Sequence, residues 1–158
     1  MIPSKIKFGI IGCSRVAIKG MLPAMRDSEF AELFIIGSRD KSKAKEIANQ
    51  FGAKTFGSYE DVINSKDIQA VYVSLPNALH EEWAIKALEA GKHVICEKPA
   101  AISYDAAKRM TEAAKKNNVR LLEGLMFRYH PQHAKVKEFI QKGILGDLLA
   151  VEGCFAYA

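Results

Sequence analysis

Three polar segments of the sequence have the residue types to take part in chemistry, and each follows an apolar run. They are residues 74–80, 97–99 and 123–131. If the apolar runs are strands of an open α/β sheet, these segments lie at the carboxyl ends of the strands, where such sheets hold their functional groups. A fixed lysine there, such as Lys98, stabilises negative charge that develops on a reacting oxygen. Taken alone, the three segments indicate only a polar cleft, and a solvated turn is the simpler interpretation of Lys98.

A glycine-containing turn earlier in the chain indicates a second kind of site. Gly12, Ser14 and Ala17 occupy the three positions of the dinucleotide-binding pattern G-x-G-x-x-G/A. Ser14 departs from the pattern where glycine lets the backbone approach the phosphates, although its hydroxyl can donate a hydrogen bond to one. A strand–turn–helix without a ligand stays open as the alternative. The residues predicted to hold a pyrophosphate at the helix N-terminus are Gly12, Cys13, Ser14, Arg15 and Val16.

The end of the second predicted strand bears on the choice of cofactor. NAD-binding domains usually carry an acidic residue at this place, whereas this sequence has Ser38 and Arg39 before Asp40, and Lys43 follows in the next helix. A hydroxyl, a guanidinium and an ammonium suit a ribose 2′-phosphate. The sequence therefore predicts NADP in preference to NAD, with NAD as the alternative. Asp40 is expected to cap the following helix with either cofactor, and a solvated Arg39 would remove the preference.

Strand and helix patterns alternate along the chain. The predicted strands are residues 5–11, 33–37, 54–56, 70–75, 93–96 and 119–122. The predicted helices are residues 14–26, 41–51, 58–64, 77–90, 104–117 and 131–142, with Asn77 and Ser103 as N-caps and Pro23 at a kink or near an end. Repeated βα units with short, continuously apolar strands indicate a parallel sheet with helices on both faces. The predicted fold class is α/β, a Rossmann-type doubly wound parallel sheet.

The last residues of the chain suggest a second domain. Residues 148–157 alternate in polarity, which predicts a strand of a different sheet. We therefore expect a nucleotide-binding Rossmann domain at residues 1–146. Residues 147–158 are interpreted as the first strand of a missing C-terminal α/β domain, so that the chain is a truncated piece.

Composition disfavours several other classes of protein. The net charge of the 158 residues is +5, but the lysines are dispersed along predicted helices, so no nucleic-acid partner is expected. The longest apolar runs are far shorter than the ~20 residues that cross a bilayer, so no membrane association is expected. The three cysteines, Cys13, Cys96 and Cys154, form no metal-type pair. They are interpreted as reduced thiols of a cytoplasmic protein without a metal site.

Two motifs in a fixed order carry a family resemblance. Residues 91–99, Gly-Lys-His-Val-Ile-Cys-Glu-Lys-Pro, are the more specific one, and the pattern Leu75-Pro76-Asn77-x-x-His80 precedes them. With this spacing, nearly the whole chain resembles the N-terminal domain of the glucose–fructose oxidoreductase/inositol dehydrogenase (Gfo/Idh/MocA) family. The resemblance implies an NAD(P)-dependent oxidoreductase that acts on CH–OH groups.

The resemblance also implies roles for individual residues. Lys98 matches the family's catalytic lysine, which lies beside the nicotinamide ribose and the substrate hydroxyl, and Pro99 matches a proline that is usually cis. Glu97 matches a residue that lines the cofactor site, and Arg128 lies where family members approach the nicotinamide carboxamide or the substrate. The loop that passes the cofactor between adenosine and nicotinamide is matched by Leu75, Pro76, Asn77 and His80.

Within the family, residues 21–25, 80–83 and 126–133 look most like nucleotide-sugar 3-ketoreductases. The implied reaction is hydride transfer between nicotinamide and a carbonyl or hydroxyl carbon of a sugar or nucleotide-sugar. Sugar and trans-dihydrodiol dehydrogenases of the same family stay open, as does a non-catalytic NAD(P)-binding module. The proton donor is expected in the C-terminal domain, whose sheet commonly makes family members homo-oligomers.

Overall fold

The computed structural model describes residues 5–154 and 156. The chain divides into two compact units between Gly124 and Leu125, and each unit is described by itself. Among the described residues, no helix combines the length and the apolar character needed to span a membrane.

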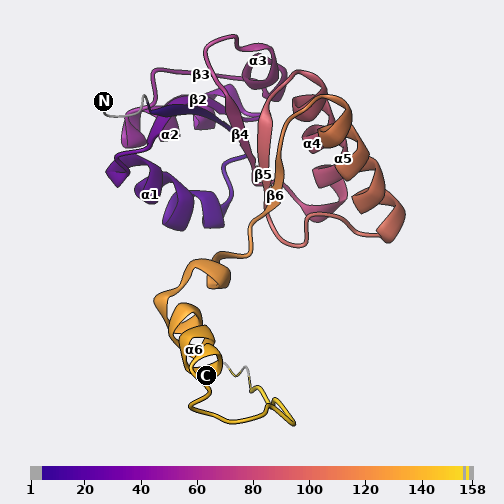
Figure 1. Ribbon diagram of the computed structural model, residues 1–158. Coiled ribbons are helices and arrows are strands. Elements are labelled where there is room, and N and C mark those ends of the chain that lie inside the picture. The colour runs from indigo at the N-terminus through magenta and orange to yellow at the C-terminus, as the bar shows by residue number, and fades with distance from the viewer. Residues whose placement is uncertain (1–4, 155, 157–158) are drawn as a thin grey trace. The chain divides into compact units, whose positions relative to one another are not determined.

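The first unit is built on a six-stranded parallel sheet with the strand order β3-β2-β1-β4-β5-β6 (Figure 1). The strands are β1 (Ile6–Ile11), β2 (Ala31–Gly37), β3 (Thr55–Gly57), β4 (Ala70–Val73), β5 (His93–Cys96) and β6 (Leu121–Glu123). This order is that of a Rossmann fold, and it reverses between β1 and β4. The predicted fold class is therefore confirmed, and the reversal places a crevice at the carboxyl ends of β1 and β4.

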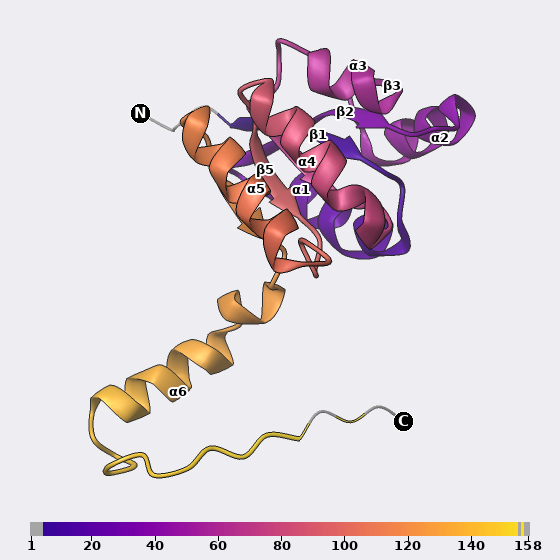
Figure 2. The same ribbon diagram turned by 90° about the vertical axis from the view of Figure 1, so that its right-hand side faces the viewer.

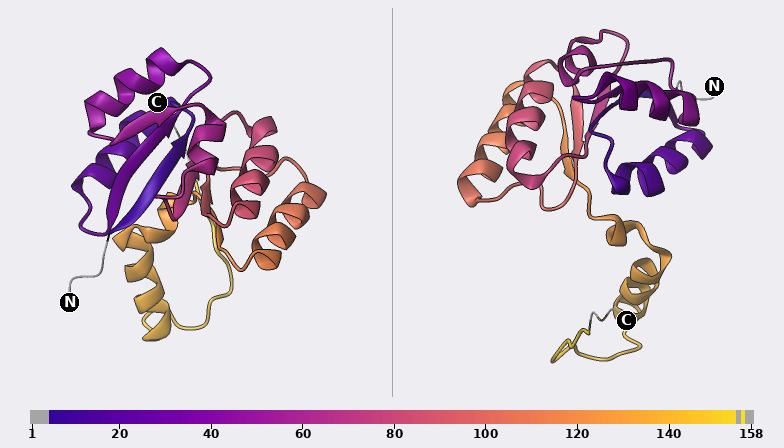
Figure 3. Two further views of the ribbon diagram at one scale, coloured as in Figure 1. Left: turned by 90° about the horizontal axis from the view of Figure 1, so that it is seen from above. Right: turned by 180° about the vertical axis from the view of Figure 1, so that it is seen from behind.

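Helices cover both faces of the sheet because the strands are apolar on both sides. The helices of this unit are η1 (Ala17–Met21, a π-helical turn), α1 (Leu22–Asp27), α2 (Lys41–Phe51), α3 (Tyr59–Asn64), η2 (Asn77–Leu79), α4 (His80–Glu89) and α5 (Tyr104–Lys116). One core lies between the sheet and α1 and α2, and its centre is the fully buried Ile10 and Ile36. The other core lies under α3, α4 and α5, around Val71 and Val73. Figures 2 and 3 show α4 and α5 side by side, on the opposite face from α1.

Short side chains begin several helices, and the sequence predicts two of them, Asp40 and Ser103. Asp40 accepts hydrogen bonds at the start of α2, Ser58 forms a capping box with Asp61 in α3, and the Ser103 hydroxyl accepts from Ala106 N in α5. Gly91 follows α4 with a φ of +74°, a left-handed conformation that ends the helix without strain.

Two local predictions differ from the structure. Asn77 is not the N-cap of α4: it begins the separate 3-10 turn η2, and neither turn nor helix start receives a side-chain cap. The helix predicted at residues 14–26 contains the π-helical turn η1 before α1, and Pro23 lies in the first turn of α1. Proline is tolerated there because its missing N–H is not needed in a first turn.

The second unit contains η3 (Met126–Tyr129) and α6 (Pro131–Gln141). His130 caps α6 by accepting a hydrogen bond from Gln132 N, and Gly143 follows with a φ of +66°. The strand predicted at 148–157 is wrong for residues 148–154, which have no regular secondary structure. A strand needs a neighbouring strand to accept and donate its backbone hydrogen bonds, and none of the described residues provides one. Tyr157 lies outside the described residues.

Candidate functional site

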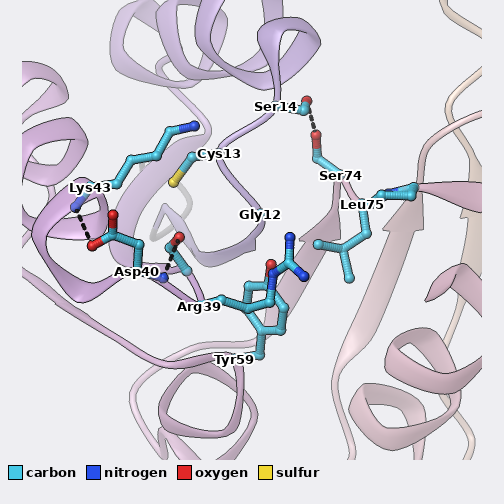
Figure 4. A pocket seen from close by; sticks show the side chains of 11 residues that line it. Gly12, Cys13, Ser14, Arg39, Asp40, Lys43, Tyr59, Ser74 and Leu75 are labelled. Atoms are coloured by element: carbon cyan, nitrogen blue, oxygen red, sulfur yellow. Dashed lines mark hydrogen bonds between the residues drawn. The ribbon is translucent and has the colours of Figure 1, made fainter.

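A pocket of about 700 Å³ opens at the carboxyl ends of β1, β2 and β4 (Figure 4). This is the crevice that the reversal of strand order predicts, and its volume is typical of a small-molecule or cofactor site. Its lining residues come from three loops and two helices, α2 and α3: Gly12, Cys13, Ser14, Ser38, Arg39, Asp40, Lys43, Tyr59, Ser74, Leu75 and Pro76.

The turn after β1 forms the floor of this pocket. Gly12 has a φ of +98°, and a Cβ there would lie 2.4 Å from the carbonyl oxygen of Ser74. Only glycine fits both constraints. Ser14 accepts a hydrogen bond from Ala17 N at 3.1 Å, and its hydroxyl is also hydrogen-bonded to that of Ser74 (Figure 4). Either hydroxyl of this pair can donate to the other, which leaves one proton to turn toward a ligand.

The end of the pocket beside β2 is basic. The Asp40 carboxylate accepts from the Ser42 hydroxyl at 2.6 Å, from Lys43 N at 3.3 Å and from Ser42 N at 2.8 Å, and these bonds hold its pKa below the usual value. Because Asp40 is committed to the start of α2, it is poorly placed to accept from a ribose hydroxyl. Arg39 and Lys43 are exposed and line the pocket, and the guanidinium of Arg39 points into it (Figure 4).

Charged and polar groups at this end of the pocket shift the pKa of the Cys13 thiol. Burial raises the pKa of the Cys13 thiol, while the nearby Lys43 ammonium and a hydrogen bond with Ser38 lower it. The positive charge of Lys43 thus acts on the turn after β1, residues 12–16, which we call the phosphate turn. It would attract an anion bound there.

Lys98 follows β5, at the same edge of the sheet. Cys96 pairs with Val73 in the β4–β5 register, so the turns after β4 and β5 begin at one level. The Lys98–Pro99 peptide bond is cis, as the family resemblance implies. Glu97 is 8% exposed, and its carboxylate accepts from Tyr72 Oη at 2.6 Å. The Lys98 side chain is exposed, so a buried carboxylate and an exposed ammonium adjoin in one turn.

His80 lies below these loops rather than in the pocket. It is fully buried, and its ring nitrogens lie 2.8 Å from the carbonyl oxygen of Leu75 and 2.9 Å from that of Pro99. The imidazole therefore ties the turn after β4 to the turn after β5. The family resemblance predicts His80 along the cofactor, whereas the structure places it where it contacts the backbone of both turns.

The structure brings most of the predicted residues together, but not all. The predicted residues that line the one pocket are Gly12, Cys13, Ser14, Ser38, Arg39, Lys43, Leu75 and Pro76. Arg15 and Val16 have exposed side chains and lie at the helix start, where first-turn N–H groups lack helical acceptors. Asn77, Glu97 and Lys98 belong to the adjoining turns outside the lining. Arg128 lies in the second unit, in η3, and its predicted role stays a prediction.

Two residues of the lining were not predicted as site residues: Tyr59, and Ser74, which was named only as part of the polar segment 74–80. Tyr59 is the first residue of α3, and its ring packs edge-on against that of Trp83 with the ring centroids 4.9 Å apart. No short-range pattern marks it, because only the packing of α3 and α4 brings it to the pocket. Ser74 carries a signal that was available: it is the first polar residue after an all-buried strand.

The comparisons with known proteins agree with this geometry. Residues 6–125 match the Gfo/Idh/MocA model, described as an oxidoreductase family with an NAD-binding Rossmann fold. The chain belongs to this family. The match covers every strand of the sheet and all residues of the pocket, so the family resemblance seen in the two motifs is confirmed.

Several relatives act on sugars. The chain is 36% identical over 150 residues to a dTDP-3,4-didehydro-2,6-dideoxy-alpha-D-glucose 3-reductase of Actinomadura kijaniata, covering 95% of this chain and 45% of that protein. It is 35% identical over 151 residues to D-xylose 1-dehydrogenase (NADP(+)) 2 of Haloferax volcanii, covering 95% of this chain and 46% of that protein. This family member thus spans slightly less than half the length of these curated relatives.

Solved structures show the same domain. The 3-ketoreductase KijD10 of Actinomadura kijaniata, in complex with TDP-benzene and NADP, matches with a TM-score of 0.84 and 37% identity over 89% of this chain and 45% of that chain. A scyllo-inositol dehydrogenase of Lactobacillus casei with bound NAD(H) and scyllo-inositol matches with a TM-score of 0.82 and 25% identity, over 91% of this chain and 43% of that chain.

Proposed function

We propose that this chain is the cofactor-binding part of an NADP-dependent oxidoreductase that transfers a hydride between nicotinamide and a carbonyl or hydroxyl carbon of a sugar or nucleotide-sugar. The observation that carries the proposal is the pocket at the reversal of strand order, with a glycine turn at one end and basic side chains at the other. The relatives and the KijD10 complex support the sugar substrate and NADP.

The residues of the pocket fit a dinucleotide with an additional phosphate. Gly12 leaves no Cβ in the phosphate turn, and the following helix start offers N–H groups to a pyrophosphate. Ser38, Arg39 and Lys43 would hold the ribose 2′-phosphate, since Asp40 is engaged by α2. When bound, the nicotinamide supplies the hydride chemistry, and the protein contributes position and electrostatics.

Lys98 is the residue to which we assign the catalytic role in this part of the protein. Its ammonium would stabilise the negative charge that develops on the reacting oxygen of the sugar during reduction. Glu97 and Pro99, on either side, fix the turn that carries it. The proton donor and most of the sugar pocket belong, in this proposal, to a C-terminal domain.

Fluorescence titration of this chain with NADPH and NADH tests the proposal. Trp83 is 8% exposed and packs against Tyr59 of the pocket, so it serves as an energy donor to a reduced nicotinamide. Saturable binding, tighter for NADPH than for NADH, is expected. Tighter NADH binding would contradict the assignment of Ser38, Arg39 and Lys43, and binding of neither would contradict the nucleotide site itself.

A homo-oligomer and a cytoplasmic location are part of the same proposal for the whole protein. The oligomer follows from the role that the family's C-terminal sheet commonly has. The location is supported by the three cysteines, which are free thiols. Sedimentation of the full-length protein and of this chain would separate an oligomer that depends on the C-terminal part from one that does not.

A further inference from the structure

A buried tyrosine lies beneath the turn that carries Lys98. Tyr72 is in the middle of β4, is fully buried, and packs in the core formed with α1 and α2. Its hydroxyl donates to Glu97 Oε1 at 2.6 Å. A phenylalanine would fill the same core, so the hydroxyl has a purpose other than packing. A buried hydroxyl is costly unless it is hydrogen-bonded, and this one is bonded to a carboxylate of the site.

The Glu97 carboxylate also contacts the backbone of the turn that carries Lys98. Its second oxygen, Oε2, accepts from the backbone N–H of Lys98 at 3.3 Å. A Cβ at Gly124 would lie 3.2 Å from Glu97 Oε1, so the glycine leaves the space that the carboxylate occupies. The carboxylate is thus held between the Tyr72 hydroxyl and the Lys98 backbone, and its position fixes where Lys98 leaves the sheet.

Ser74, the residue that follows β4, belongs to a second hydrogen-bonded pair. Its hydroxyl is hydrogen-bonded to that of Ser14. Burial and the bond to Glu97 raise the pKa of Tyr72. Two hydrogen-bonded pairs of side chains, Ser14 with Ser74 and Tyr72 with Glu97, therefore involve the turns after β1, β4 and β5.

We propose that Tyr72 is a positioning residue for Lys98: its hydroxyl holds Glu97, and Glu97 sets the turn against which the nicotinamide end of the cofactor binds. The inference rests on the proposed function. Tyr72 should therefore affect binding of the nicotinamide end of the cofactor alone. In the proposed function the adenosine end is held by Ser38, Arg39 and Lys43, on the far side of Gly12.

The test compares two ligands on four forms of this chain. NADPH reaches both ends of the site, whereas adenosine 2′,5′-bisphosphate reaches only the basic end. The forms are the wild type, Tyr72→Phe, Glu97→Gln and, as a matched control for the lost hydroxyl, Tyr104→Phe, whose side chain is 81% exposed at the start of α5. Affinities are measured by calorimetric titration, and thermal unfolding is recorded for each form.

Tyr72→Phe is expected to weaken NADPH binding roughly tenfold, which is what the loss of one hydrogen bond to a charged group produces. Binding of adenosine 2′,5′-bisphosphate should stay within twofold of the wild-type value, and Tyr104→Phe should change neither. Glu97→Gln should also give a selective loss, because the amide has no charge and replaces one of the two acceptor oxygens by an NH2 donor.

Equal weakening of both ligands by Tyr72→Phe would overturn the inference, because it would show a general effect on folding rather than on the Lys98 turn. Unchanged NADPH binding in both Tyr72→Phe and Glu97→Gln would overturn it as well, while leaving the proposed function intact. Failure of the wild-type chain to bind either ligand would overturn the proposed function, and the inference with it.

Discussion

The imidazole of His80 and the carbonyl oxygen of Pro99 lie 2.9 Å apart, although the two residues belong to loops that follow different strands. The second ring nitrogen of His80 lies 2.8 Å from the carbonyl oxygen of Leu75. Each ring nitrogen thus lies within hydrogen-bond distance of a backbone carbonyl oxygen, and a ring nitrogen that carries a proton donates to such an oxygen. This buried side chain connects the turn after β4 to the turn that carries the proposed catalytic lysine.

Replacing His80 by alanine should therefore destabilise the domain and loosen both loops. At least one of the two part-buried carbonyl contacts would lose its donor, at a cost of about 1–3 kcal/mol for a group left unsatisfied. Urea unfolding measures the loss, and NADPH affinity should fall in parallel. Glu89→Ala, at the exposed end of the same helix, is the control and should change neither quantity. An unfolding midpoint unchanged by His80→Ala would contradict the structural role.

Gly12→Ala should abolish NADPH binding. The new Cβ would lie 2.4 Å from Ser74 O, and the φ of +98° is strained for any side chain, so about 1–3 kcal/mol of stability should be lost. Gly20→Ala is a matched control, because a Cβ at Gly20 meets nothing within 4 Å. Fluorescence titration and thermal unfolding of the two variants check the pair, and equal effects would refute a specific role for Gly12.

Arg39→Ala should remove the preference for NADPH. A guanidinium contributes charge-assisted hydrogen bonds to a phosphate, so NADPH affinity should fall roughly tenfold or more, while NADH affinity stays near the wild-type value. Lys45→Ala, which removes a charge from α2 outside the pocket lining, keeps the preference. A loss shared equally by NADPH and NADH would show that Arg39 serves some part of the cofactor other than its 2′-phosphate.

The three thiols should differ in their reactivity toward iodoacetamide at pH 8. Burial raises the pKa of Cys96 from its ordinary 9.0 to about 12 and also raises that of Cys13, so both are protonated and slow to react. Cys154 is exposed and should react first. Cys13 should react more slowly and be protected by NADPH, because it lines the pocket. Mass spectrometry of the labelled peptides gives the order, and rapid labelling of Cys96 in the folded chain would contradict it.

The same shift links Cys96 to stability. The folded thiol ionises at a higher pH than the unfolded one, so its contribution to stability is complete below the ordinary pKa of 9.0 and declines as the pH rises above it. Cys96→Ala should therefore reduce the loss of stability between neutral and alkaline pH. Urea unfolding of both forms at several pH values measures this difference.

Lys98→Met in a full-length protein should lower kcat on the order of a hundredfold or more, because a fixed charge at the reacting oxygen is lost. The side chain is exposed and lies outside the pocket lining, so NADPH affinity should change little. Steady-state kinetics and titration separate the two effects, and Lys98→Arg, which keeps the charge, should retain more activity. Near-normal turnover of Lys98→Met would remove Lys98 from the catalytic role.

Local sequence was enough for the elements that depend on neighbouring residues. Asp40 and Ser103 start their helices, and Gly91 ends one, because a cap acts within a single turn. The glycine turn at Gly12 was found for the same reason. The predicted strand is wrong at residues 148–154 because a strand is not local: its backbone groups need a partner that the sequence pattern cannot supply.

The sequence pattern was sufficient to predict the alternation of strands and helices, the parallel sheet, the glycine turn and the polar cluster of Ser38, Arg39 and Lys43. The contacts beneath the site depend on the tertiary structure. Tyr72 and Glu97 are 25 residues apart in sequence, and His80 and Pro99 are 19 apart. These pairs meet because β4 and β5 are neighbours in the sheet with Val73 opposite Cys96. Register and strand order are properties of the whole sheet, so the contacts of Tyr72 with Glu97 and of His80 with Pro99 could not be read from any one segment.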